Sequence, residues 1–151
     1  MPMRRRSPHT AVPTTVRLTA DGVAKVLGDL EARVIEALWE LDAPASARTV
    51  HELVEQEHDV ALLTVVTVLN KLVTKALVRR RKIDDLFHYS PTSTRDEFLA
   101  RTSRQMVEGI LEFGPEAVAV SFIDVLAEQD PERLADLARL VRRRLREQRE
   151  R

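Results

Sequence analysis

The segment Leu62–Lys75 carries short hydroxyl side chains and cations in a helical pattern. Its apolar residues recur at three- and four-residue steps and share one helical stripe, which comprises Val65, Val68, Leu69, Leu72 and Ala76. The opposite stripe has hydroxyls towards its N-terminal end and ammonium groups towards its C-terminal end, namely Thr64, Thr67, Lys71, Thr74 and Lys75. Small polar side chains suit base edges and cations suit phosphates, so this stripe favours DNA recognition. For an isolated helix, a solvated outer face would explain the same pattern.

A charged ribbon follows this helix and strengthens the DNA interpretation. Four consecutive cations, Arg79–Lys82, precede a turn predicted at Ile83–Asp85, and the chain returns as Leu86–Ser90. Alternation places Phe87 and Tyr89 on one face of the returning strand. The two aspartates suit a tight turn because their side chains bond nearby backbone amides, which explains them better than a pair of catalytic carboxylates does.

Two further helices should precede the candidate recognition helix and position it. Asp29 is placed to cap a helix that runs to Leu41, and Ala43–Ala45 should break that helix. Ser46 is placed to cap a second helix, and Gln56–Asp59 form the turn that follows it. The expected buried residues of both helices are Leu30, Val34, Leu38, Leu41, Val50, Leu53 and Val54. Three helices followed by a hairpin predict a winged helix-turn-helix, whose wing normally lies against phosphates.

The distribution of charge along the chain agrees with this prediction, whereas the net charge of zero gives no information about the partner. Lys plus Arg and Asp plus Glu both number 24 in the 151 residues. Residues 29–59 contain two basic and nine acidic side chains, whereas residues 60–91 contain six basic and two acidic ones. Cations gathered on one supersecondary unit are the expected electrostatic footprint of DNA binding.

Beyond the ribbon, the sequence predicts three amphipathic helices. Thr94–Glu97 is a capping box for a helix that runs to Phe113, a second helix spans roughly 116–128, and Asp130-Pro131 begins the last. Three apolar stripes without a sheet cannot easily be buried within one short chain, so we expect pairing with a second copy. The residues expected in this homodimer interface are Leu99, Met106, Ile110, Phe113, Phe122, Leu126, Leu137 and Val141.

The fold class expected is therefore mainly α with a small β-hairpin, in three parts. Residues 1–26 form a flexible basic arm, 27–91 a winged helix-turn-helix DNA-binding domain, and 92–151 a helical dimerisation region with a charged tail. An inert arm is favoured over one that enters a minor groove. No apolar stretch follows Arg4–Arg6 or is long enough to span a bilayer, so we expect no membrane insertion and a cytoplasmic location.

The sequence gives no support to an enzyme, a metal site or a cofactor. The chain has no cysteine, which excludes thiolate ligands and thiol redox chemistry. His51, Glu55 and His58 fall near one face of the second helix and could hold a metal, but such residues on an exposed acidic helix are usually solvated. The four glycines form no phosphate-binding loop, and no serine lies in a nucleophile elbow.

These segments together resemble the penicillinase-repressor family, which controls β-lactamase and methicillin-resistance genes and includes a copper-responsive branch. The segments that carry the resemblance are Leu27–Glu31, Val50–Glu52, Thr64–Leu69, Leu72–Val78 and Phe87–Tyr89, within a likeness from about Leu27 to Leu140. The resemblance implies a dimeric winged-helix repressor of inverted repeats, joined through its C-terminal helices. It also implies that Thr64 and Thr67 face bases while Lys71 and the wing contact the DNA backbone.

The chain departs from the family pattern at two places. Copper-branch members carry C-terminal cysteine pairs, which are absent here, so copper sensing through thiolates is excluded. In the antibiotic-responsive branch, a membrane sensor-linked metallopeptidase cuts an Asn-Phe bond. The matching bond here is Ser121-Phe122, in which the phenylalanine fits and the serine does not. Inactivation by proteolysis and inactivation by a ligand that shifts an intact dimer both remain open.

We predict a homodimeric transcriptional repressor that binds double-stranded DNA at inverted-repeat operators and is relieved by proteolysis or by a ligand. The alternative is a helical protein-interaction module without specific DNA binding, in which the basic hairpin is incidental. The residues predicted to contact DNA are Arg48, Leu63, Thr64, Val66, Thr67, Asn70, Lys71, Lys75, Arg80, Lys82 and His88.

Overall fold

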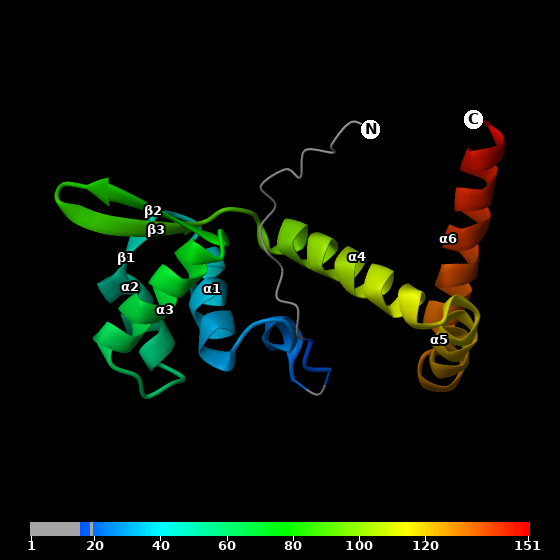
Figure 1. Ribbon diagram of the computed structural model, residues 1–151, viewed down its shortest axis with the longest axis horizontal. Coiled ribbons are helices and arrows are strands. Elements are labelled where there is room, and N and C mark those ends of the chain that lie inside the picture. Colours follow the sequence, from blue (N-terminus) through cyan, green and yellow to red (C-terminus); the bar gives the residue numbers. More distant parts are fainter. Residues whose placement is uncertain (1–15, 19) are drawn as a thin grey trace, which may run out of the picture. The chain divides into compact units, whose positions relative to one another are not determined.

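The computed structural model describes residues 16–18 and 20–151 (Figure 1). The chain divides into two compact units, and the boundary between them falls between Thr102 and Ser103. Most of the predicted N-terminal arm lies outside the described residues. Its last part does not behave as an arm, because Gly22–Lys25 form a short 3-10 helix, η1, and Val23 and Val26 are buried. The folded part of the first unit therefore begins before residue 27.

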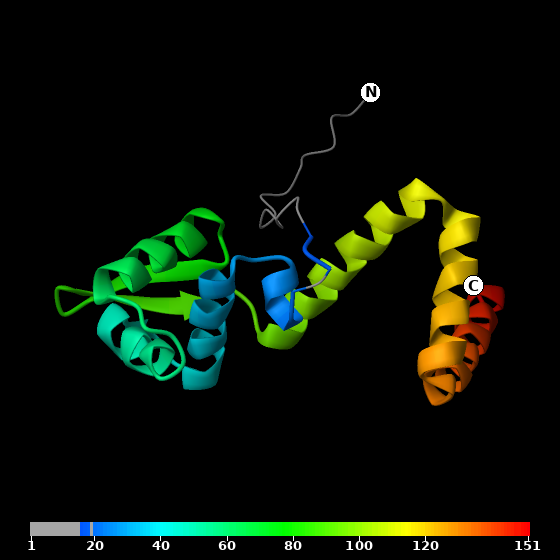
Figure 2. The same cartoon turned by 90° about the horizontal axis from the view of Figure 1, so that it is seen from below.

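Three helices build the core of the first unit: α1 (Asp29–Leu41), α2 (Ala47–Glu55) and α3 (Leu62–Thr74). All three pack against one another (Figure 2). Ile35 and Ala37 are enclosed, and the predicted core residues that are fully enclosed as well are Val34, Leu38, Val50, Val54, Val65, Leu69 and Leu72. The predicted periodicity is confirmed for these residues, while Leu30, Leu41 and Leu53 are only half-buried.

The two predicted helix caps have different outcomes. Ser46 caps α2 as expected, since its Oγ accepts a hydrogen bond from the backbone N–H of Thr49 at 3.3 Å. Asp29 does not cap α1, whose N-cap is Gly28. The Asp29 carboxylate instead accepts a hydrogen bond from the guanidinium of Arg17 at 2.9 Å. The helix begins one residue earlier than predicted, so Asp29 is its first residue and Gly28 holds the extended N-cap conformation.

The C-terminal end of α3 departs from the predicted stripe. Ala76 was expected to be buried, but the helix ends at Thr74 and Ala76 is exposed in the left-handed conformation at φ 59°. Leu77 takes the buried place, and its N–H donates to the carbonyl of Leu72 at 3.0 Å. This bond satisfies one of the free carbonyls at the helix end.

The predicted hairpin is part of a three-stranded antiparallel sheet in the order β1-β3-β2. Its strands are β1 (Ala45–Ser46), β2 (Val78–Ile83) and β3 (Leu86–Pro91). Asp84 and Asp85 alone form the turn, at φ 49° and 63°, so Ile83 belongs to the strand rather than to the turn. Two positive φ values are those of the hairpin turn that matches the twist of its strands. Helix order, sheet and wing confirm the winged helix-turn-helix.

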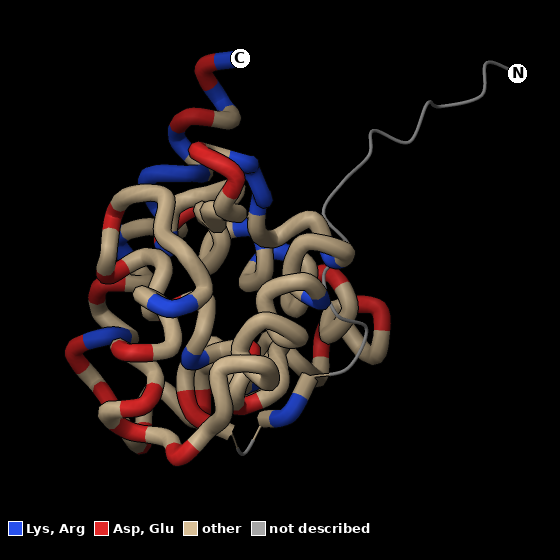
Figure 3. Tube along the Cα trace, turned by 90° about the vertical axis from the view of Figure 1, so that its left-hand side faces the viewer, with Lys and Arg blue, Asp and Glu red and all other residues tan. Residues whose placement is uncertain are grey.

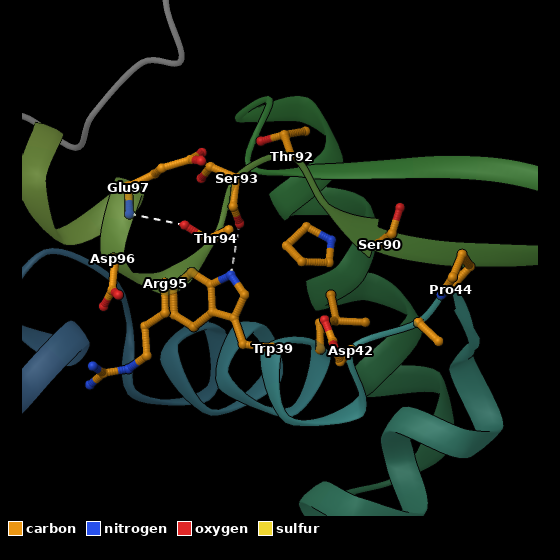
Figure 4. Close-up of a pocket in the computed structure, with 13 residues that line it drawn as sticks. Trp39, Asp42, Pro44, Ser90, Thr92, Ser93, Thr94, Arg95, Asp96 and Glu97 are labelled. Carbon is orange, nitrogen blue, oxygen red and sulfur yellow. Dashed lines mark hydrogen bonds between the residues drawn. The ribbon is translucent and has the colours of Figure 1, made fainter.

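The start of α4 (Arg95–Phe113) is anchored in the first unit (Figure 4). Trp39 donates its indole N–H to the carbonyl of Ser93 at 3.0 Å, and Thr94 Oγ1 accepts from the N–H of Glu97 at 3.1 Å. Phe98 is 1% exposed and lies 5.5 Å from Trp39 between ring centroids. The packing of the first unit therefore extends past residue 91, where the predicted winged helix-turn-helix domain ends.

The second unit contains the rest of α4, α5 (Pro115–Gln129) and α6 (Pro131–Arg149). Asp130 caps α6 as expected, with its carboxylate accepting from the N–H of Arg133 at 3.1 Å. In a single chain none of residues 103–151, all of which the structure describes, is buried. Within the described residues, no helix is both long and apolar enough to cross a bilayer.

Candidate nucleic-acid interface

The outer face of α3 gathers four of the predicted DNA-contacting residues. Leu63, Thr64, Thr67 and Lys71 are all exposed, and Leu63 is 75% exposed. The opposite face of the same helix is enclosed by α1 and α2. Burial of one stripe therefore fixes which side chains α3 presents to solvent.

Hydrogen bonding within α3 limits what Thr67 can offer. Its hydroxyl donates to the carbonyl of Leu63 at 3.0 Å, one turn earlier. A hydroxyl whose proton is engaged in this way still has lone pairs that can accept. In this rotamer Thr67 can therefore accept a hydrogen bond from the exocyclic amine of adenine or cytosine, and its methyl group can contact thymine.

A groove beside α3 brings together residues from three elements. It is lined by Arg48 near the start of α2, by Leu62 and Val66 of α3, and by Leu86 and Phe87 of β3. Two of the predicted residues, Arg48 and Val66, thus face the same hollow although they lie 18 positions apart in the sequence. Arg48 is exposed and suits a phosphate beside base edges, whereas Asp85, which lines the same groove, would repel one.

The wing has two faces, and the register of its strands decides which cations share one. Arg80 lies opposite Tyr89 and Lys82 opposite Phe87, whereas Arg81 lies opposite His88. Residues directly opposite in a pair point to the same side of the sheet. Arg80 and Lys82 therefore share the face of Tyr89, which is buried against the first unit's core. His88 lies on the other face, so the structure separates it from the two predicted wing cations.

The ring of Phe87 contacts both cations on the wing face that carries Tyr89. The guanidinium carbon of Arg80 lies 4.4 Å from the centre of its ring, and the ammonium of Lys82 lies 5.8 Å from it. Both distances are within the range of cation–π attraction. Sequence reasoning did not select Phe87, although its position opposite Lys82 follows once the two-residue turn is known.

Lys75 is engaged inside the first unit rather than free for a phosphate. Its ammonium donates to Glu31 of α1 at 2.6 Å, and the Glu31 side chain is only 15% exposed. This ion pair joins the C-terminal end of α3 to the N-terminal end of α1. Lys71, one turn earlier and exposed, forms no ion pair with any residue that the structure describes.

Some carboxylates of the first unit form ion pairs within that unit. Arg33 is buried and pairs with Glu40 and Glu57, each at 3.1 Å. Figure 3 marks the basic and acidic positions along the chain. The cations of β2 from Arg79 to Arg81 have no carboxylate partner among the described residues, so their charge remains available to an anion.

The histidines of the predicted second helix do not gather into a metal site. His51 Nε2 lies 2.6 Å from the carbonyl of Val60, and its Nδ1 lies 4.0 Å from Glu55. No group of three or more potential ligands capable of holding a metal is found among the described residues. The role that the structure gives to His51 is to tie α2 to the turn before α3.

The family model named penicillinase repressor matches residues 27–143. In two strains of Mycobacterium tuberculosis, the protein named transcriptional regulator BlaI is 42% identical over 74 residues, which are 49% of this chain. The match spans about half the length of these curated relatives, 54%. A solved structure of Lactococcus lactis ZitR is 12% identical with a TM-score of 0.39, covering 87% of this chain and 82% of its own.

The two faces of the wing give a prediction with a matched control. Replacing Arg80 and Lys82 together with alanine should weaken binding to any duplex DNA and flatten the dependence of log K on log salt by about two units. Replacing Arg79 and Arg81 removes the same charge from the other face and should change the slope much less. Fluorescence anisotropy across a salt series measures both, and equal losses for the two pairs would contradict the assigned face.

Proposed function

The chain belongs to the penicillinase repressor family, and we propose that it is a cytoplasmic DNA-binding transcriptional repressor that acts as a homodimer on inverted-repeat operators. The observation that carries this proposal is the exposed face of α3 lying beside the cation-bearing face of the wing. The relatives named transcriptional regulators support it. Membership in a repressor family also agrees with the expectation that the chain is not an enzyme.

The dimensions of α3 suit the major groove. Its 13 residues extend about 20 Å, and a helix fits a groove about 12 Å wide. With α3 in the groove, Thr64 and Thr67 face base edges while Leu63 and Val66 offer apolar contact to thymine methyl groups. Arg48, Lys71, Arg80 and Lys82 then lie at the borders of the interface, where phosphates are.

The second unit supports a homodimer through its exposed apolar side chains. Phe113 is 91% exposed in the single chain. The other exposed apolar residues of this unit are Val107, Ile110, Leu111, Val120, Phe122, Ile123, Val125, Leu140, Val141 and Leu145. Burying one Val, Leu, Ile or Phe side chain is favourable by about 1.5–3 kcal/mol relative to leaving it exposed to water. A second copy brings an equivalent apolar surface, which is the simplest partner for such a face.

Relief of repression is proposed at the bond between Ser121 and Phe122, cut by a membrane sensor-linked metallopeptidase. The bond lies in the middle of α5, and both side chains are exposed in the single chain. A helical bond must unwind locally before a protease can bind it. Cutting there would remove α6 and half of α5 and would leave the DNA-binding face unchanged.

The function is tested by selecting duplexes from a random-sequence pool with the full-length protein. We expect an inverted repeat to be enriched and its affinity to fall steeply with salt. Thr67→Ala should then relax the preference at one position of each half-site, at a cost of about 1–3 kcal/mol. The alternative, a helical protein-interaction module, would enrich no sequence and show no salt-dependent binding.

Dimerisation is tested by a chain that ends at Thr102, where the first unit ends. It should be monomeric by analytical ultracentrifugation and should bind a half-site weakly, because tethering two heads raises their effective concentration. A chain ending at Pro91 is unsuitable because it lacks Phe98, whose loss alone should cost about 3–5 kcal/mol. Dimers of the Thr102 chain at micromolar concentration would refute the assigned interface.

Proteolytic relief is tested by immunoblotting cells under cell-wall antibiotic stress. Cleavage predicts an N-terminal fragment of residues 1–121 that accumulates as the repressed genes are switched on. Full-length protein that persists while those genes are transcribed would instead support a ligand that shifts the intact dimer.

A further inference from the structure

Asn70 lies at the point where α3 meets the wing. Its Oδ1 accepts a hydrogen bond from the guanidinium of Arg80 at 3.2 Å and one from the hydroxyl of Tyr89 at 3.3 Å. Arg80 comes from β2 and Tyr89 from β3, and the two lie directly opposite each other in the strand pair. One side-chain oxygen of α3 therefore joins both strands of the wing.

The chemistry of these groups fixes how the Asn70 amide is oriented. A guanidinium has five N–H donors and no acceptor, so the atom that faces Arg80 must be the oxygen and not the nitrogen of the amide. That oxygen has two lone pairs, and two donors already occupy them. Adenine is recognised by an asparagine that accepts from N6 and donates to N7 at the same time. Asn70 has no free acceptor for that pairing.

We propose that Asn70 does not recognise a base but is a positioning residue that couples the recognition helix to the wing through Arg80. This inference rests on the proposed DNA-binding function. Phe87 holds the same guanidinium from a second side, at 4.4 Å from the ring centre. Tyr89 is 3% exposed, so the other donor to Asn70 is fixed by the core of the unit.

The hydrogen bond from Arg80 to Asn70 fixes the position of the Arg80 guanidinium before DNA binds. A long arginine side chain loses rotamer freedom when it binds a phosphate, and the loss is smaller when the side chain is already held. Because the contact concerns the DNA backbone, removing Asn70 should weaken binding to all sequences alike. A residue that recognises a base would instead lower affinity for the selected operator alone.

The first arm of the test needs no DNA. In the full-length protein, the Nη–H NMR resonances of Arg80, whose Nη1 donates to Asn70, should shift on Asn70→Ala. Asn70→Asp retains an acceptor oxygen and adds a charge, so a hydrogen-bonded Nη–H resonance of Arg80 should remain. Tyr89→Phe removes only the second donor and should leave the bond between Asn70 and Arg80 in place. An Arg80 resonance unchanged by Asn70→Ala would overturn the coupling, whatever the protein binds.

The second arm is a double-mutant cycle on two duplexes: one selected from the random pool by the wild-type protein, and a scrambled duplex of the same length and composition. Asn70→Ala should weaken binding to both by about two- to tenfold, the scale of ordering one long side chain that is no longer held in place. Combined with Arg80→Ala it should add less than about twofold to the effect of Arg80→Ala alone. Combined with Arg81→Ala, on the other face of the wing, its effect should remain additive.

The opposite pattern would overturn the inference. A loss confined to the selected duplex, multiplicative with Arg80→Ala and accompanied by a changed preference at one base pair, would show that Asn70 recognises a base. If the wild-type protein binds neither duplex, the proposed function fails, and the NMR arm alone decides whether Asn70 holds Arg80.

Discussion

The enclosure of one stripe of α3 is the constraint on which the rest of the interface depends. Val65, Leu69 and Leu72 have no measurable exposure because α1 and α2 pack over them. A helix held on one side can present only its opposite side, so the same burial exposes Thr64 and Thr67 together. The hydrophobic effect thus selects the polar residues that a DNA groove would meet. Rotating α3 about its axis would expose the apolar stripe and at the same time turn the threonines away from solvent.

Charge pairs then decide which cations remain free on that exposed side. Lys71 of α3 and Lys75 at its C-cap lie one turn apart, yet among the described residues only Lys75 has a carboxylate partner. The partner, Glu31, is 44 residues away in the sequence, so periodicity along α3 could not distinguish the two lysines. A paired ammonium would have to give up its carboxylate before it could bind a phosphate, and this competition lowers its contribution. Among the described residues, Arg79, Arg80 and Arg81 of the wing have no carboxylate partner, while Lys82 lies 4.0 Å from the fully exposed carboxylate of Asp85.

The sequence predicted the features that depend on local patterns, and it missed those that depend on distant partners. Helix boundaries, the Ser46 cap and the aspartate turn follow from periodicity and from side chains within a few residues. Strand β1 has two residues, too short for any alternation, and exists only because β3 pairs with it. Asp29 is the first helical residue rather than the cap, and its partner Arg17, which lies 12 residues earlier, could not be read from the local pattern. The grouping of Arg80, Asn70 and Tyr89 likewise depends on strand register, which a residue pattern alone does not specify.

The two units differ in how much of their apolar surface a single chain buries. The first unit encloses a core of its own, formed by apolar side chains between Val23 and Phe98. The second unit buries no residue by itself. An isolated helix face of this kind gains its stability from packing rather than from helix propensity. If a second copy supplies that packing, folding of the second unit and dimerisation become a single equilibrium. Any event that disrupts the packing of these helices would then also separate the two DNA-binding heads.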